Sequence, residues 1–116
     1  MSKVLIIDDE EDVRKYLSAI LRKHGYETVT ASDGKEALTL VRSERPNLVT
    51  LDLMMPNQSG TDFYRQLAQD KELCETPVIV VSGLPGRHLA VREPAAVFDK
   101  PIDPAVFIDT VKRVIG

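Results

Sequence analysis

Short apolar runs in this 116-residue chain end in side chains that could do chemistry together. Asp8 and Asp9 follow the first run, Asp52 ends another, Ser82 a third, and Lys100 follows the last. A carboxylate, a hydroxyl and an ammonium group at such places could bind a charged, oxygen-rich ligand and take part in its reactions. If the fold brought these five residues together, they would form one polar site.

Three carboxylates beside one ammonium would form an oxygen-rich site of the kind that Mg²⁺ prefers. A site built on histidine or cysteine is not indicated, because the chain has two histidines and one cysteine, Cys74. A carboxylate in this setting could attack phosphorus, since Mg²⁺ and lysine would neutralise the phosphoryl oxygens as they gain charge. The product would be an acyl phosphate on aspartate.

Each residue also has a simpler interpretation. An ionised Asp52 inside an apolar run costs several kcal/mol unless cations or hydrogen bonds compensate it, but it could also cap the next turn. Asp8 and Asp9 could be acids that favour the start of a helix. Lys100 could be a surface lysine near a turn. The chemical interpretation therefore depends on the elements that carry these residues.

Alternating strands and helices would position these residues at one edge of a sheet. Apolar, β-branched runs predict strands over residues 3–7, 27–31, 48–52, 78–81 and 95–99, and helical spacing predicts helices between most of them. Gly25 is a helix stop, Ser32 or Asp33 a helix cap, and Asp103 with Pro104 a helix start. Such alternation predicts a parallel sheet with helices on both faces, where ligands gather at the carboxyl ends of the strands.

The composition is that of an ordinary globular domain. It also limits the classes of partner that the chain is expected to bind. With 43% hydrophobic and 28% charged residues, residues 1–116 are expected to form one domain. The net charge of −3, with acids concentrated from Asp8 to Asp12, argues against direct nucleic-acid binding. A single cysteine fits a reducing compartment. No signal peptide or membrane-spanning run is visible, so we expect a cytoplasmic protein.

Four motifs in this order resemble the receiver domain of bacterial two-component response regulators, over the whole chain. The motifs are VLIIDDEEDVR, LVTLDLMMPNQSG, VIVVSG and DKP, and their combination is far more specific than any one of them. The resemblance implies a CheY-like, flavodoxin-like α/β fold. In that fold a doubly wound, five-stranded parallel sheet has the order 2-1-3-4-5 and about five helices. The fourth helix is expected to be short or irregular here.

The resemblance also implies the roles of the acids. Asp52 would be the phosphoacceptor. Asp8 and Asp9 would hold Mg²⁺, directly or through water, together with Asp52. The main-chain carbonyl of Met54, two residues past the acceptor, would be a further metal ligand.

The remaining roles follow from the same resemblance. Ser82 would donate a hydrogen bond to one phosphoryl oxygen and Lys100 would pair with another, and the bond from Lys100 to Pro101 is expected to be cis. The donor would be a phosphohistidine on a sensor histidine kinase or a histidine phosphotransfer protein. Such a domain is no conventional enzyme: it promotes its own phosphorylation and dephosphorylation, and signals to a downstream protein target or an output domain.

Two features depart from the family pattern. The family usually carries Phe or Tyr three residues before the lysine, where this chain has Val97, and strand alternation directs the neighbouring Phe98 to the opposite face. The interval from Ser82 to Lys100 is 100 − 82 = 18 positions, about one helical turn shorter than expected. We therefore expect residues 83–94, more than an aromatic side chain, to respond to the phosphate.

Three alternatives remain open at this level. A pseudo-receiver would keep the fold as an interaction module without phosphorylation control. A flavodoxin-like cofactor binder would need a phosphate-binding loop after the first strand, where DDEEDVR is acidic. An aspartate-based phosphohydrolase would need a second acid two residues after its nucleophile, and that position is Met54.

Overall fold

The computed structural model describes residues 2–53, 55, 59–82 and 94–116, apart from the side chain of Ser82. In this part of the chain five parallel strands form one sheet in the order β2-β1-β3-β4-β5, which confirms the expected topology. The strand boundaries agree with those expected to within one residue. The strands are β1 (Lys3–Ile7), β2 (Glu27–Ala31), β3 (Leu48–Asp52), β4 (Val78–Ser82) and β5 (Ala96–Asp99).

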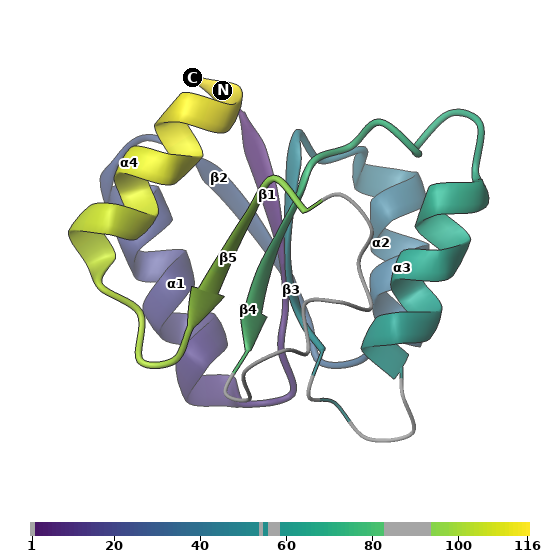
Figure 1. Cartoon of the computed structure of the whole chain (residues 1–116), viewed down its shortest axis with the longest axis horizontal. Coiled ribbons are helices and arrows are strands. Elements are labelled where there is room, and N and C mark those ends of the chain that lie inside the picture. The colour runs from purple at the N-terminus through teal and green to yellow at the C-terminus, as the bar shows by residue number, and fades with distance from the viewer. Residues whose placement is uncertain (1, 54, 56–58, 83–93) are drawn as a thin grey trace.

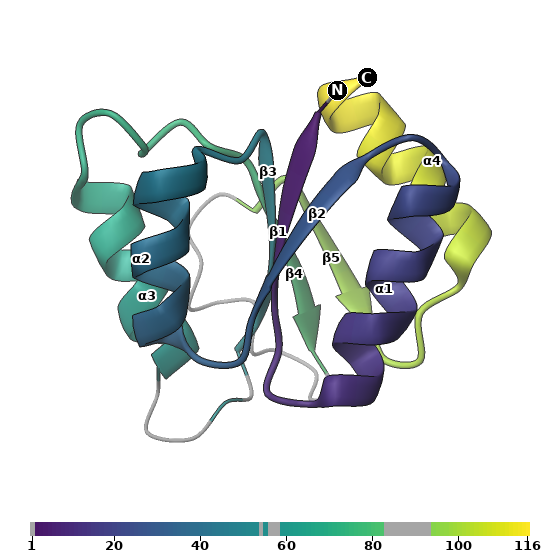
Figure 2. The same ribbon diagram turned by 180° about the vertical axis from the view of Figure 1, so that it is seen from behind.

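Helices cover both faces of the sheet. Among the described residues they are α1 (Glu11–Lys23), α2 (Gly34–Glu44), α3 (Ser59–Gln69) and α4 (Pro104–Ile115). Helices α1 and α4 lie on one face, and α2 and α3 on the other (Figures 1 and 2). The fourth helix, which the interval from Ser82 to Lys100 is expected to make short or irregular, falls within residues 83–94, almost all of which lie outside the described residues. No described helix has the length and apolarity to cross a membrane.

The alternation of side chains along each strand divides the core into two clusters. In β1, Leu5 and Ile7 pack in the cluster beneath α2 and α3, whereas Val4 and Ile6 pack in the cluster beneath α1 and α4. All four are at most 1% exposed. Because both faces of the strand are buried, its sequence is apolar throughout and does not alternate with polar residues.

The helix ends follow the signals expected from the sequence. The Asp33 side chain accepts a hydrogen bond from the Glu36 N–H at 2.8 Å, and Asp103 accepts one from the Ala105 N–H at 2.9 Å. After α1 the chain turns at Gly25, whose φ of +89° belongs to the left-handed region that glycine adopts most readily. These local hydrogen bonds fix where each helix begins or ends and therefore where the next strand enters the sheet.

Gly60, in the first turn of α3, permits this helix to lie directly on the end of β3. A Cβ atom at this position would lie 2.6 Å from the carbonyl oxygen of Asp52 and 3.3 Å from the Cα of Leu53. Both neighbours are main-chain atoms, which cannot move aside as a flexible side chain could. The contact therefore sets the distance between α3 and the strand that carries Asp52.

We expect Gly60→Ala to lower the free energy of unfolding by about 1–3 kcal/mol, because the added methyl group overpacks a main-chain contact. Urea denaturation would measure it. Ser59→Ala is the matched control: the Ser59 hydroxyl is buried without a hydrogen-bond partner among the described residues, so its loss should cost little or nothing. Equal stability of the two variants would contradict this account of Gly60.

Candidate functional site

The carboxyl ends of three strands bring together the acids and the lysine. Asp8 directly follows β1, Asp52 is the last residue of β3, and Lys100 directly follows β5. The Lys100 Nζ atom lies 3.1 Å from Asp8 Oδ2 and 3.3 Å from Asp52 Oδ2. Both aspartates are only 1% exposed. The edge strand β5 thus delivers a cation that bridges acids of the adjacent inner strands β1 and β3.

The main chain and one arginine fix the orientation of Asp8. The Glu10 N–H donates to Asp8 Oδ1 at 2.9 Å, which leaves Oδ2 for Lys100. The Asp8 N–H donates to the carbonyl oxygen of Ala31 at 3.1 Å, and Arg14 Nη1 donates to the Asp8 carbonyl oxygen at 2.7 Å. Asp8 is therefore held in one position before any ligand binds.

Burial makes the charged form of Asp8 unfavourable. Loss of hydration, with a smaller contribution from the nearby charge of Asp52, raises the pKa of the Asp8 carboxyl from 3.8 to about 6. The hydrogen bond from the Glu10 N–H and the Lys100 ammonium both oppose this shift without cancelling it. The site thus carries a carboxylate that one ammonium does not fully stabilise.

The surroundings of Lys100, in contrast, favour its charged form. Burial acts to lower the pKa of Lys100, but a hydrogen bond to Asp8 and the charges of Asp52, Asp8 and Glu10 together outweigh burial and raise it. Lys100 therefore stays protonated at neutral pH. Two buried carboxylates and one ammonium leave an excess of negative charge, which would favour binding of a cation.

Asp8, Asp9 and Glu10 form a group that could hold a metal ion. One carboxylate oxygen from each lies within 4.8 Å of the others, and Asp9 and Glu10 are exposed where Asp8 is buried. An all-oxygen donor set with an exposed side fits Mg²⁺, which retains several waters when it binds to proteins. The residues therefore fit the cofactor expected from the sequence.

Glu10 is a site residue that the sequence reasoning missed. Its Oε1 atom lies 3.5 Å from Lys100 Nζ, so the lysine contacts three acids. The available signal was the acidic run of five residues that begins at Asp8. From the sequence, Glu10 could not be distinguished from an ordinary acid before a helix, because α1 begins at the next residue.

Two of the predicted site residues, Ser82 and Met54, lie partly or wholly outside the described residues. The main chain of Ser82 ends β4 and pairs in register with Asp99 of β5, next to Lys100. Its side chain, and the whole of Met54, lie outside the described residues. The role of Ser82 as a hydrogen-bond donor to a phosphoryl oxygen and that of the Met54 carbonyl as a metal ligand remain predictions.

The strand that precedes Lys100 departs from the family pattern as expected. Val97 is 39% exposed on β5, whereas Phe98 faces the core, where its ring packs edge-on against Phe107 with centroids 5.7 Å apart. Phe98 therefore cannot stand in for the aromatic residue that the family usually has at Val97. The bond between Lys100 and Pro101 is cis, as expected.

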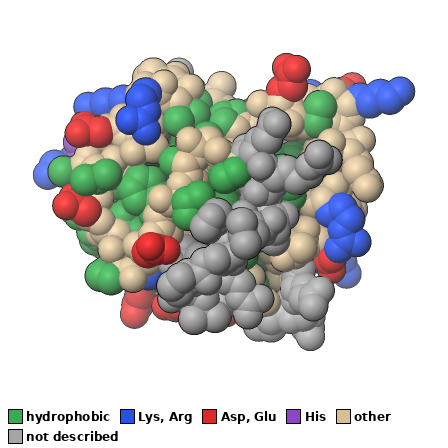
Figure 3. All heavy atoms as spheres, in the orientation of Figure 1, with side chains coloured by type: hydrophobic (Ala, Val, Ile, Leu, Met, Phe, Trp, Pro, Cys, Tyr) green, Lys and Arg blue, Asp and Glu red, His purple; other side chains and the backbone are tan. Residues whose placement is uncertain are grey.

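Apolar side chains are exposed on the same side of the molecule. Among the described residues, Val97 of β5 and Val106 of α4 are exposed, Val106 to 51%. Figure 3 shows hydrophobic side chains gathered on the face of the molecule that carries these two elements. A pocket beside Lys100 is lined by Val13, Pro101 and Ile102, among others. The surroundings of the acidic site are therefore partly apolar, which is common where proteins meet.

Comparisons with known proteins agree with this geometry. The model of the response regulator receiver domain family matches residues 4–112. The chain is 35% identical to the polar-differentiation response regulator DivK of Brucella anthropi over 117 residues, covering 97% of this chain and 95% of DivK. Its fold matches the chemotaxis protein CheY4 of Vibrio cholerae with a TM-score of 0.88, at 29% identity and 98% coverage of both chains. It also matches the response regulator TrrA of Thermotoga maritima in complex with Mg²⁺-BeF, with a TM-score of 0.82, 27% identity and coverage of 98% and 99%.

The raised pKa of Asp8 predicts an unusual dependence of stability on pH in metal-free buffer. Between about pH 4 and 6 the folded state binds more protons than the unfolded state, so the free energy of unfolding falls as pH rises through this window. Asp8→Asn, which cannot ionise, should therefore be more stable than the parent at pH 7, by about 1–3 kcal/mol. The difference should disappear below about pH 4.

Urea denaturation with EDTA across this pH range would check the prediction. Asp9→Asn is the control, because Asp9 is exposed and its replacement should change the free energy of unfolding by less than about 0.5 kcal/mol. A lower stability of Asp8→Asn than of the parent at pH 7 would show that the pair with Lys100 outweighs the cost of burial.

Proposed function

The chain belongs to the family of response regulator receiver domains, and we propose on this premise that Asp52 accepts a phosphoryl group from a phosphohistidine. The donor would be a sensor histidine kinase or a histidine phosphotransfer protein of a two-component system. The observation that supports this most directly is the Lys100 ammonium, 3.3 Å from Asp52 and 3.1 Å from Asp8 at the carboxyl ends of the strands.

In the proposed reaction, a carboxylate oxygen of Asp52 attacks the phosphorus atom. The bond between phosphorus and the histidine nitrogen breaks, and its electron pair remains with the imidazole. Lys100 already lies beside Asp52 and would pair with one phosphoryl oxygen as it gains negative charge. The Ser82 hydroxyl would donate to another. The product is an acyl phosphate on Asp52.

The proposed metal ligands are Asp8, Asp9, Asp52 and the main-chain carbonyl of Met54. Mg²⁺ held there would supply positive charge to the phosphoryl oxygens. Asp8 is pre-oriented by its hydrogen bond from the Glu10 N–H, and Asp9 is exposed beside it. The structure of TrrA with Mg²⁺-BeF supports the same cofactor, because it is a neighbour in fold over nearly the whole chain.

We propose that the domain transmits a signal and does not catalyse the repeated conversion of a substrate. Receiver domains are typically not conventional enzymes, and we infer that this one promotes only its own phosphorylation and dephosphorylation. It would then change conformation and act on a downstream protein or an output domain, without direct contact to nucleic acid. We expect it to do so in the cytoplasm.

A pseudo-receiver without phosphorylation control is the second candidate. The observation in its favour is the packing of β5, where Val97 replaces the family aromatic residue and Phe98 is held against Phe107. The arrangement of Asp8, Asp52 and Lys100 favours the phosphoacceptor instead. The cofactor binder and the phosphohydrolase lose their support, because the family match covers residues 4–112.

Incubation of the chain with acetyl phosphate and Mg²⁺ should add one phosphoryl group, measured as intact mass. The gain should vanish in Asp52→Asn, which lacks the nucleophile, and when EDTA removes the metal. Asp99→Asn is the matched control: it removes an exposed acid next to Lys100 and should leave the gain unchanged. No gain in a folded chain that binds Mg²⁺ would favour the pseudo-receiver.

Glu10 should add to the affinity for Mg²⁺ through its charge. Glu10→Gln should weaken Mg²⁺ binding by about two- to fivefold, as expected for one exposed charge in a cluster. Isothermal titration calorimetry would measure the dissociation constant. Glu11→Gln is the control, because Glu11 pairs with Lys15 outside the cluster. An equal loss of Mg²⁺ affinity in both variants would mean that Glu10 contributes only to the overall negative charge of this region and has no specific place in the cluster.

A further inference from the structure

Arg14, in the first turn of α1, contacts the chain on both sides of Asp9. Its Nη1 atom donates a hydrogen bond to the main-chain carbonyl oxygen of Asp8 at 2.7 Å. Its main-chain N–H donates to the carbonyl oxygen of Glu10 at 3.2 Å. Side chains on a helix point back toward the N-terminus of the helix, so Arg14 can reach a residue that precedes α1. The side chain of Arg14 is partly buried in this position.

The carbonyl oxygen of Asp8 needs a donor of this kind. The pairing of β1 with β2 and β3 ends at Ile7, so Asp8 lies beyond the last pair on both sides. Asp8 is only 1% exposed, and buried main-chain carbonyl groups are nearly always hydrogen-bonded. Because a peptide unit is planar, a bond that fixes this oxygen also fixes the plane of the peptide between Asp8 and Asp9.

Asp9 depends on this main chain for the direction of its carboxylate. Asp8 is held by the Glu10 N–H and by Lys100, whereas the side chain of Asp9 is exposed. Oxygens of Asp8, Asp9 and Glu10 lie within 4.8 Å of one another. Mg²⁺ demands near-ideal octahedral geometry, so a small rotation of the main chain at Asp9 would spoil a shared site.

The charge of Arg14 does not by itself favour a metal ion. A cation in the first turn of a helix opposes the helix dipole, and a cation near a metal site repels the metal. The alternative role for Arg14 is to balance the acids from Asp8 to Asp12. The two roles predict opposite results: loss of a charge-balancing cation would strengthen Mg²⁺ binding, whereas loss of a positioning residue would weaken it.

We propose that Arg14 is a positioning residue for Mg²⁺ binding. Its hydrogen bond to the Asp8 carbonyl oxygen orients the peptide between Asp8 and Asp9 so that both carboxylates can share one ion. This inference rests on the metal site of the proposed function and adds a residue that does not touch the metal.

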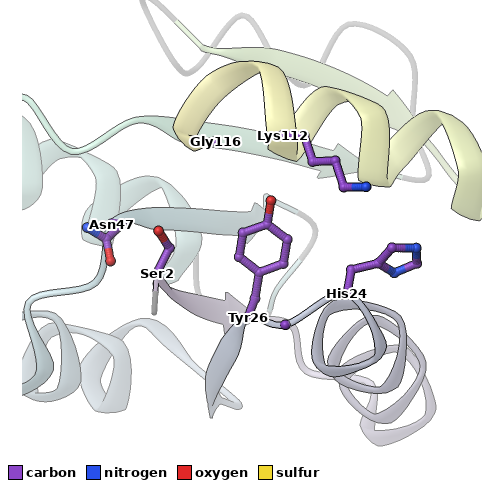
Figure 4. Close-up of a pocket in the computed structure, with 7 residues that line it drawn as sticks. Ser2, His24, Tyr26, Asn47, Lys112 and Gly116 are labelled. Atoms are coloured by element: carbon purple, nitrogen blue, oxygen red, sulfur yellow. The ribbon is translucent and has the colours of Figure 1, made fainter.

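A titration with Mg²⁺ should report on this one site. Among the described residues, no other group of three acid, histidine or cysteine side chains lies within such reach. The hollow at the amino ends of the strands has no aspartate or glutamate side chain among its described lining residues. Figure 4 shows the residues there: Ser2, His24, Tyr26, Asn47, Lys112 and Gly116.

The test is isothermal titration calorimetry of the whole chain with magnesium chloride at neutral pH. Arg14→Met should weaken Mg²⁺ binding by about five- to tenfold, because it removes one hydrogen bond that orders the loop. Arg14→Lys should bind Mg²⁺ more tightly than Arg14→Met, because its ammonium can still donate to the carbonyl oxygen. An effect of charge alone would reverse this order.

Arg22→Met is the matched control. Arg22 lines the same groove beside α1 as Arg14, but it lies 22 − 14 = 8 residues farther along the helix, about 12 Å away. Its Nε atom donates to Thr28 Oγ1 at 2.9 Å, far from the acids. The variant removes the same charge and should change the dissociation constant for Mg²⁺ by less than about twofold.

Mg²⁺ binding by Arg14→Met as tight as in the parent or tighter would overturn the role of Arg14, and so would an equal loss in Arg22→Met. A parent chain that binds no Mg²⁺ would overturn the metal site of the proposed function and this inference with it. If the parent binds Mg²⁺ but gains no phosphoryl group, the proposed phosphoacceptor fails, while the calorimetry still decides the role of Arg14.

Discussion

One partly buried ammonium, shared between two buried carboxylates, organises the end of the sheet where the strands have their carboxyl ends. Lys100 reaches from the edge strand β5 to Asp8 and Asp52, which end the adjacent strands β1 and β3. Two negative charges this close repel each other strongly in a site of low polarity. The lysine relieves only part of this repulsion, as the raised pKa of Asp8 shows. The site therefore has an excess of negative charge, which a bound cation would reduce.

The two ends of the sheet have opposite chemical character. Acids gather at the carboxyl ends of the strands, where Asp8, Asp9 and Glu10 lie within reach of one ion. At the amino ends the charges are paired: Lys3 Nζ lies 2.9 Å from Glu44 Oε1 and 3.9 Å from Glu27 Oε2. In a parallel sheet all strands run the same way, so residues that precede strands and residues that follow them are separated by the length of the strands.

Strand β5 of this receiver domain lacks the aromatic residue that the family resemblance led us to expect at Val97. An aromatic side chain that turns inward on phosphorylation needs a position facing the site, and that position holds Val97. Phe98 is committed to the opposite face by its contact with Phe107. The strand itself would have to be rebuilt for Phe98 to take over, because a shift of one residue moves every side chain of the strand to the other face.

The sequence alone determined the strands and several helix ends. It also determined that five polar residues with possible site roles stand at the strand ends: Asp8, Asp9, Asp52, Ser82 and Lys100. These follow from local causes: apolar runs for buried strands, Asp33 and Asp103 as caps, Gly25 in a left-handed turn. Only the tertiary structure decided which groups meet. Lys100 bonds Asp52 across 48 positions, Glu10 joins the lysine, and the Tyr26 hydroxyl opens into a hollow. Such contacts depend on the register between strands and on how helices pack over them, and no local pattern in the chain encodes those distances.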